Sequence, residues 1–166
     1  MNKRIQVLAA ALMTVGVVAT TAAQAKPLTE AQARVAIAPL YDALNVSNDK
    51  DSADLVRNGT TDDWMSCNSN DNCAPRDKAA QAIAGYGKML PDMKWAIKEV
   101  IVSGNRVIVR GEGSGTPAGE FFGVPHTGKS FKIMSVDIHT IKNGKLSGKT
   151  YHLEDWAGAL RQLSTK

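Results

Sequence analysis

The chain has few of the residues that build metal or redox centres. It contains two cysteines and three histidines in 166 residues, and two cysteines without a second pair give little support for a structural zinc site. It also lacks internal repeats and any recognisable linker. These absences exclude repeat architectures and chains of linked modules, and the length suits one domain with a single core.

No apolar run is long enough to span a membrane. The N-terminus MNKRIQVLAAALMTVGVVATTAAQA has a basic start, an apolar stretch from Ile5 to about Val18, and a small-residue site that ends at Ala25. A spanning helix needs roughly 20 apolar residues, so the pattern predicts a signal peptide over 1–25, with an uncleaved anchor as the alternative. No cysteine lies near the expected cleavage site after Ala25, so a lipid anchor is not expected there. We expect a mature domain of residues 26–166, without a stable membrane anchor, in the periplasm or secreted.

Positive charge is too sparse to indicate a nucleic-acid partner. The formal net charge of the whole chain is +4, but Lys3 and Arg4 belong to the signal and residues 1–25 contain no acids, so the mature chain carries +2. The remaining basic residues are scattered along the sequence. No nucleic-acid footprint is therefore predicted.

The two cysteines lie close together in the polar run WMSCNSNDNCAPRD. Both belong to the exported part of the chain, where disulfides persist. A metal site and a redox-active pair are the alternatives, although a redox pair would more often read C-x-x-C. We expect a structural disulfide between Cys67 and Cys73.

Hydrophobic periodicity changes from helical to strand-like about half-way along the chain. Three helical patterns come first. The first begins at Thr29, which is its expected N-cap, the second ends near Gly59, and the third runs from about Asp77 to Leu90. A short strand at 62–65 leads into the cysteine loop, and alternating strands then follow at about 95–102, 106–113, 131–141 and 145–153, with a closing helix or turn at 156–163. Helices followed by an antiparallel meander indicate the α+β class.

The run GVPHTGKS, residues 123–130, matches the phosphate-binding pattern G-x-x-x-x-G-K-[ST]. A true phosphate loop must open a helix, whose N-terminal N–H groups hold the phosphates. Here Ser130 is followed by FKIMSVDIHTI, which alternates with period two. The match is therefore interpreted as accidental, and no nucleotide is expected.

The segment from GEGSGTPAGEFFGVPHTGKS through FKIMSVDIHTIKNGKL to LRQL resembles the SnoaL-like polyketide cyclases, also called ester-cyclase-like proteins. The resemblance is close over 111–163, and the order of elements fits from about Thr29. It implies a nuclear-transport-factor-2-like fold, also described as a cystatin-like α+β roll. In this fold a cone-shaped, curved antiparallel sheet wraps around N-terminal helices and a deep pocket. It also implies that homodimers through the outer face of the sheet are common.

Two strands are expected to carry the chemistry. Alternation places on one face of the first strand Phe131, Ile133, Ser135, Asp137, His139 and Ile141. By resemblance, Asp137 occupies the position where characterised cyclases have a His, and their acid/base Asp falls on Tyr151 or His152 of the following strand. The family's G-T-H histidine is Pro117 here. The candidate catalytic set is therefore Asp137, His139, Tyr151 and His152, and either Tyr151 or His152 faces the pocket. Burial of Asp137 in an apolar pocket would raise its pKa, and a neighbouring imidazole would exchange its proton.

Two functions are compatible with these residues. The first is cofactor-free general acid/base catalysis on a small apolar carbonyl or ester compound, of the cyclase, isomerase or lyase type. The second is a binding module that holds a hydrophobic small molecule, in which case the ionisable residues only order the strands. Candidate ligand contacts are Trp64, Trp95, Phe121, Phe131, Ile133 and Ser135. A zinc set of Asp137 with His126, His139 and His152 has spacings too wide for a local motif, and no metal is expected.

The opposite face of the 131–141 strand carries Met134, Val136 and Ile138. These side chains cannot line the same pocket as Asp137, so another surface must cover them. A second copy of the chain is the expected partner, and coverage by the C-terminal segment 156–163 is the alternative.

Overall fold

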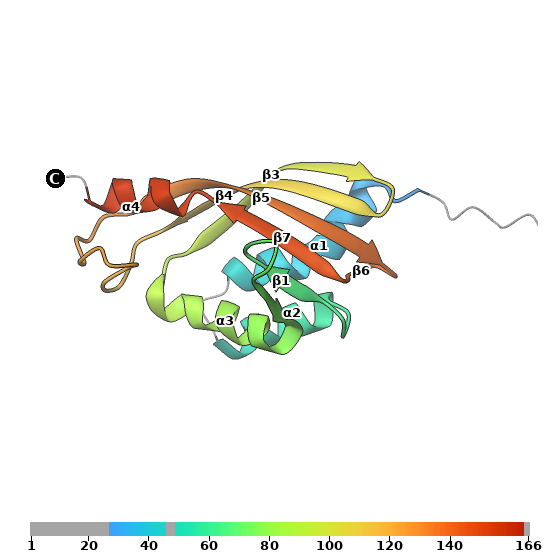
Figure 1. The fold of residues 1–166 in the computed structure, drawn as a ribbon, viewed down its shortest axis with the longest axis horizontal. Coiled ribbons are helices and arrows are strands. Elements are labelled where there is room, and N and C mark those ends of the chain that lie inside the picture. The colour runs from blue at the N-terminus through green and yellow to red at the C-terminus, as the bar shows by residue number, and fades with distance from the viewer. Residues whose placement is uncertain (1–26, 46–48, 165–166) are drawn as a thin grey trace, which may run out of the picture.

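The computed structural model describes residues 27–45 and 49–164. Within them, helices α1, α2 and α3 lie on one side of a curved sheet and α4 lies at one end (Figure 1). The elements in chain order are α1 (Glu30–Asn45), α2 (Asp49–Gly59), β1 (Met65–Cys67), β2 (Cys73–Pro75), α3 (Arg76–Met89), β3 (Lys94–Ser103), β4 (Arg106–Gly115), β5 (Phe131–Lys142), β6 (Lys145–Leu146), β7 (Lys149–Glu154) and α4 (Trp156–Ser164). The expected signal peptide, residues 1–25, lies outside the described residues. In the part of the chain that the structure describes, no helix is long and apolar enough to cross a membrane.

Helix α1 begins where the sequence predicts. The backbone N–H of Gln32 donates to Thr29 Oγ1 at 3.2 Å, and the N–H of Thr29 donates to the Gln32 side chain at 3.0 Å. This reciprocal pair is a capping box, which satisfies two N–H groups that the helix start leaves without partners. The buried face of α1 recurs at helical spacing and includes Ala33, Ile37 and Tyr41. Tyr41 is thereby turned toward the sheet.

The strands follow the order β2-β1-β7-β5-β4-β3, and β6 also pairs with β5. Neighbouring strands are antiparallel except β1 and β7, which run parallel. The expected hairpin turn is present at Asn143 and Gly144, whose φ angles of 53° and 74° are those that a tight two-residue turn requires. The strand predicted at 145–153 is broken into β6 and β7, because the chain turns at Gly148 with a φ of 61°. The α+β class, with a curved sheet against N-terminal helices, is confirmed.

The predicted alternation along β5 is also confirmed. Its inward face, from Phe131 to Ile141, is buried against the helices, whereas Met134 on the opposite face is 58% exposed. Register then fixes the faces of β7, because residues directly opposite each other in an antiparallel pair share a face. His152 is paired with the inward Asp137, and Tyr151 is paired with the outward Ile138. His152, and not Tyr151, therefore faces the interior.

Helix α4 covers the inward side of one end of the sheet. Its Ala159 and Leu163 pack in one apolar cluster with Phe121, Phe131 and Ile133. The alternative in which this segment covers the outer face is therefore wrong. Among the described residues, Met134 and Leu153 leave the outer face partly apolar and open to solvent.

The cysteine loop and the glycine-rich run both behave as the sequence predicts. Cys67 and Cys73 form a disulfide that joins the adjacent strands β1 and β2. The run at 123–130 leads directly into strand β5 and opens no helix. It consequently lacks the helix N-terminus that a phosphate loop needs.

Candidate active site

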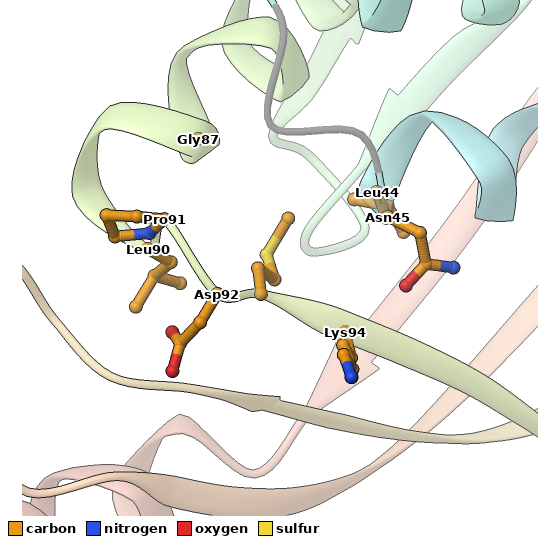
Figure 2. A pocket seen from close by; sticks show the side chains of 8 residues that line it. Leu44, Asn45, Gly87, Leu90, Pro91, Asp92 and Lys94 are labelled. Carbon is orange, nitrogen blue, oxygen red and sulfur yellow. The ribbon is translucent and has the colours of Figure 1, made fainter.

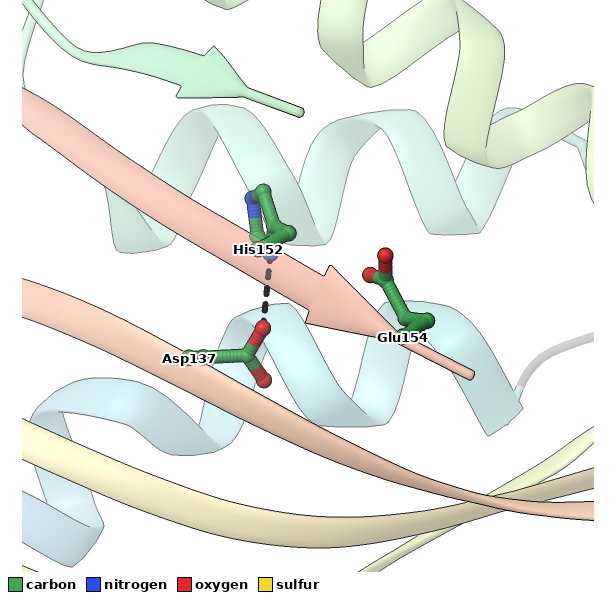
Figure 3. Close-up of side chains that lie close together, drawn as sticks. All are labelled: Asp137, His152 and Glu154. Carbon is green, nitrogen blue, oxygen red and sulfur yellow. Dashed lines mark hydrogen bonds and ion pairs between the residues drawn. The ribbon is translucent and has the colours of Figure 1, made fainter. Parts of the chain in front are cut away.

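Asp137 lies at the centre of a buried polar cluster on β5. Its side chain accepts two hydrogen bonds, one at Oδ2 from the Tyr41 hydroxyl at 2.6 Å and one at Oδ1 from His152 Nδ1 at 2.8 Å. Figure 3 shows the second bond, which links neighbouring strands. Burial by itself would raise the pKa of Asp137, but the hydrogen bond and the charge of His152 outweigh it and hold the pKa below its ordinary value. The expected raised pKa is therefore wrong, and Asp137 is a carboxylate at neutral pH.

The ionised state of Asp137 fixes the tautomer of His152. A carboxylate can only accept, so His152 must carry a proton on Nδ1, and a neutral imidazole then leaves Nε2 without one. The His152 side chain is 14% exposed and that of Asp137 only 5% exposed. Of the two, the imidazole is the group that a ligand can reach. An imidazole oriented by a buried carboxylate, with its second nitrogen open, is the arrangement of a general base.

A second layer of hydrogen bonds continues behind Asp137. The Tyr41 hydroxyl donates its proton to Asp137. The Tyr41 oxygen therefore accepts a hydrogen bond from His139 Nε2, at a distance of 3.1 Å. Burial lowers the pKa of His139 to about 4, and the ring is therefore neutral at pH 7. His139 Nδ1 then accepts from the Thr150 hydroxyl at 3.2 Å, and Thr150 accepts from the indole of Trp64 at 2.8 Å. Every donor in this chain of side chains points toward Asp137.

Glu154 is a third ionisable group at this site, and the sequence did not indicate it. It follows His152 by two residues on β7 and therefore shares its inward face (Figure 3). One side-chain atom from each of Asp137, His152 and Glu154 lies within 4.8 Å of the other two. Burial raises the pKa of Glu154, the charge of His152 works against this rise, and the charge of Asp137 adds to it.

These groups open onto a cavity of about 60 Å³ between the sheet and helices α1 and α3. Its apolar lining comprises Leu40, Leu44, Ile83, Trp95 and Trp156, and its polar lining comprises Tyr41, Ser66, Asn68, Tyr86, Asp137, His152 and Glu154. This volume is well below the roughly 300–1,000 Å³ of sites for drug-sized ligands. Only a small reacting group fits inside the cavity as it stands.

A larger groove of about 360 Å³ lies beside this cavity (Figure 2). The end of α1, the end of α3 and the segment leading into β3 form its walls, and Leu44 lines both the groove and the cavity. Trp95 of the cavity directly follows Lys94 of the groove. A ligand with a small reacting end and a longer body would find room for the body here.

The structure brings some predicted site residues together and separates others. Asp137 and His152 are in direct contact, and Trp95 lines the cavity and donates to the hydroxyl of Ser135 behind it at 3.2 Å. His139 is linked to Asp137 by hydrogen bonds through the Tyr41 hydroxyl. The prediction of Tyr151 as a pocket residue is corrected, because strand alternation turns it outward with Ile138.

Five predicted ligand contacts lie outside the cavity lining, namely Ser135 behind Trp95 and four residues that pack elsewhere. Trp64 is fully buried in the main core, where it donates to Thr150. Phe121, Phe131 and Ile133 belong to the cluster under α4, since this helix covers their end of the sheet. Tyr41, Tyr86, Glu154 and Trp156 line the cavity instead.

Asp137, His152 and Glu154 are the group in the described residues whose atoms lie close enough to hold a metal ion. One imidazole and two carboxyl groups are ligand types for a transition metal, but Asp137 and His152 already bind each other through an oxygen and a nitrogen. An ion bound through Asp137 Oδ1 and His152 Nδ1 would have to replace the hydrogen bond between them. The zinc set considered from the sequence is not assembled, because His126 lies exposed in the loop before β5.

The sequence profile of the SnoaL-like polyketide cyclases matches residues 38–163. The chain belongs to this family. A structure described as a SnoaL-like polyketide cyclase from Jannaschia sp. CCS1 is 21% identical, with a TM-score of 0.71 over 86% of this chain and 99% of that one. TsrD from Streptomyces laurentii is 20% identical, with a TM-score of 0.70 over 82% and 98% of the two chains. No protein with a curated description matches the chain.

A more distant structure supports the same fold. A protein with a ketosteroid isomerase-like fold from Catenulispora acidiphila DSM 44928 is 11% identical, with a TM-score of 0.63 over 79% of this chain and 93% of that one. At these identities the likeness concerns the fold, which is the nuclear-transport-factor-2-like α+β cone. The family supports a cofactor-free role of the cyclase or isomerase type, and the specific chemistry depends on the site.

Proposed function

We propose that this protein is an exported, cofactor-free acid/base catalyst that acts on a small apolar carbonyl or ester compound. The observation that carries the proposal is the hydrogen bond between His152 Nδ1 and the buried carboxylate of Asp137. It orients the imidazole and leaves Nε2 as the base. In the proposed reaction, Nε2 removes a proton from the carbon next to the carbonyl group, and Asp137 stabilises the imidazolium that forms.

The family resemblance supports this assignment in an unexpected way. The characterised cyclases pair a His at the position of Asp137 with an Asp on the following strand. Here the following strand supplies His152, directly opposite Asp137 in the register. With the cyclases' acid/base Asp aligned to His152, the same two residue types occupy exchanged positions of one cross-strand pair, and the proposed base stays on the following strand.

The rival function, capture of a hydrophobic molecule, predicts a mostly apolar cavity without converging polar groups. The cavity has apolar walls, but Tyr41, Asp137, His152 and Glu154 all line it. Burying so many ionisable groups costs free energy of folding. Clusters of buried ionisable groups concentrate at catalytic sites. The convergence therefore favours catalysis.

Export and dimerisation form part of the proposal. The N-terminal signal pattern and the Cys67–Cys73 disulfide both suit an oxidising compartment. On the outer face, a row of paired side chains crosses four strands and consists of Ile101, Ile108, Ile138 and Tyr151. Leu153 beside this row is 72% exposed, and a second copy packed sheet against sheet would cover both.

Hydrogen–deuterium exchange tests the function without knowledge of the natural substrate. The purified oxidised protein is incubated in D₂O with a panel of small ketones and β-keto esters, and deuterium at the carbon next to the carbonyl is followed by NMR. We expect catalysed exchange with at least one probe and its loss in His152→Gln, with His126→Gln in the exposed loop as the matched control. Equal exchange in wild type and His152→Gln would contradict the proposal, and so would a panel without any catalysed exchange.

A further inference from the structure

The proposed base leaves the other half of the reaction without an assigned group. When a proton leaves the carbon next to a carbonyl, negative charge develops on the carbonyl oxygen, and a nearby donor must stabilise it. Asp137 cannot donate, because it is a carboxylate that already accepts from Tyr41 and His152. The hydroxyl proton of Tyr41 is committed to Asp137 at 2.6 Å. Glu154 is the carboxyl group on the cavity wall that neither bond involves.

The position of Glu154 suits a donor. It shares the inward face of β7 with His152 and lines the same cavity, and the side-chain atoms of the two groups lie within 4.8 Å. A carbonyl oxygen and the adjacent carbon are separated by two bonds, so one substrate can contact both side chains. Trp156 and Tyr86, from α4 and α3, line the cavity with Glu154. Burial at this position disfavours a second negative charge beside Asp137.

We propose that Glu154 is a neutral carboxylic acid that donates its proton to the substrate's carbonyl oxygen while His152 Nε2 takes the proton from the neighbouring carbon. The carbon–hydrogen bond breaks, and its electron pair forms the carbon–carbon double bond of an enol. The carbon–oxygen double bond becomes a single bond, and its π electron pair binds the proton that Glu154 loses. Return of a proton from His152 to the same carbon, and of the hydroxyl proton to Glu154, gives hydrogen exchange. Delivery of the proton to a different carbon of a conjugated enol gives an isomerisation. The substrate class is an enolisable ketone or ester. This inference rests on the proposed function.

The charges around Glu154 are consistent with this role. Its neighbours that titrate are Asp137 on β5, His152 on β7, Tyr41 on α1 and Tyr86 on α3. Burial raises the pKa of Glu154, the charge of His152 lowers it, Asp137 raises it and a hydrogen bond from the Trp156 side chain lowers it, with a raised pKa as the result. Asp137, whose pKa is lowered, lies beside it. Two carboxyl groups with pKa values pushed in opposite directions are typical of an acid and an ionised partner with different roles.

The first test measures the protonation of Glu154 and needs no substrate. Carbon-13 labelling of glutamate and an NMR titration, with Glu154→Gln used to assign the signal, report its pKa directly. We expect titration above the ordinary glutamate value of about 4.3. Titration at or below that value would overturn the proton-donor role while leaving the His152 base intact.

The second test uses the exchange assay with the same probe ketones and β-keto esters. Glu154→Gln keeps a hydrogen-bond donor but cannot transfer a proton, so we expect exchange to fall by roughly 10²-fold and the alkaline limb of the pH profile to disappear. Glu120→Gln, in the exposed loop before β5, is the matched control and should leave both unchanged. A wild-type rate and pH profile in Glu154→Gln would overturn the inference alone. No exchange with wild type would overturn the proposed function and this inference together.

Discussion

We expect acid to destabilise the protein through one buried side chain, His139. The ring is fully buried, and desolvation lowers its pKa from 6.5 to about 4. The unfolded chain therefore binds a proton at a higher pH than the folded chain, and stability is lost as the pH falls from about 6.5 toward 4. Between pH 7 and pH 5 this one group should remove about 2 kcal/mol from the free energy of unfolding.

Urea denaturation of wild type and His139→Gln at both pH values isolates this effect. The variant will be less stable at pH 7, because it disturbs the bonds to Tyr41 and Thr150. However, its loss of stability between pH 7 and pH 5 should be smaller than that of wild type by about 2 kcal/mol. Asp137 and Glu154 titrate in both proteins, so their contributions largely cancel in the difference. The exposed His126→Gln should behave as wild type. Equal losses in wild type and His139→Gln would refute the assignment of a neutral, buried His139.

Three further predictions concern the dyad, the outer face and the disulfide. Asp137→Asn should lower the rate of hydrogen–deuterium exchange by roughly 10²–10⁴-fold, since an amide can donate to His152 Nδ1 and thereby move the imidazole proton to Nε2; an unchanged rate would contradict the dyad. Val136→Lys should reduce the mass measured by light scattering from two chains to one without unfolding the protein. Val35→Lys, at an exposed position on α1, should leave the mass of two chains unchanged. A wild type with the mass of a single chain would contradict the dimer. Replacing Cys67 and Cys73 by serine should cost roughly 2–2.5 kcal/mol of stability on the loop-entropy account, measured by urea denaturation, and no measurable cost would contradict a structural role for the disulfide.

Local sequence patterns predicted the elements and the faces of β5 but not the partner of Asp137 on the next strand. If the two strands continued as an unbroken hairpin from the Asn143–Gly144 turn, their register would pair Asp137 with Thr150. The break at Gly148 inserts two residues and makes His152 the partner. Two residues are one full repeat of a strand, so the inward face is preserved and only the position along it changes. A shift of this kind is invisible in an alternating pattern.

Neither Tyr41 nor Glu154 was assigned to the site from local sequence patterns. Tyr41 lies 96 residues before Asp137 and reaches it only because α1 docks against the sheet, which is a tertiary effect. On α1 it reads as one more apolar-face residue at helical spacing. Glu154 reads as a polar residue at a strand end, and its burial depends on Tyr86 and Trp156, which come from other elements. Alternation from His152 was the one signal that pointed to it, once His152 was known to face inward.

Nitrogen-15 NMR of the histidine rings tests the central claim most directly, because the proposed base exists only if Asp137 holds the proton of His152 on Nδ1. We predict that the neutral ring of His152 has Nδ1 protonated and Nε2 bare, and that addition of a ketone or β-keto ester probe perturbs Nε2. A neutral His152 with its proton on Nε2 would contradict the account, because the proposed base nitrogen would then have no lone pair with which to remove a proton.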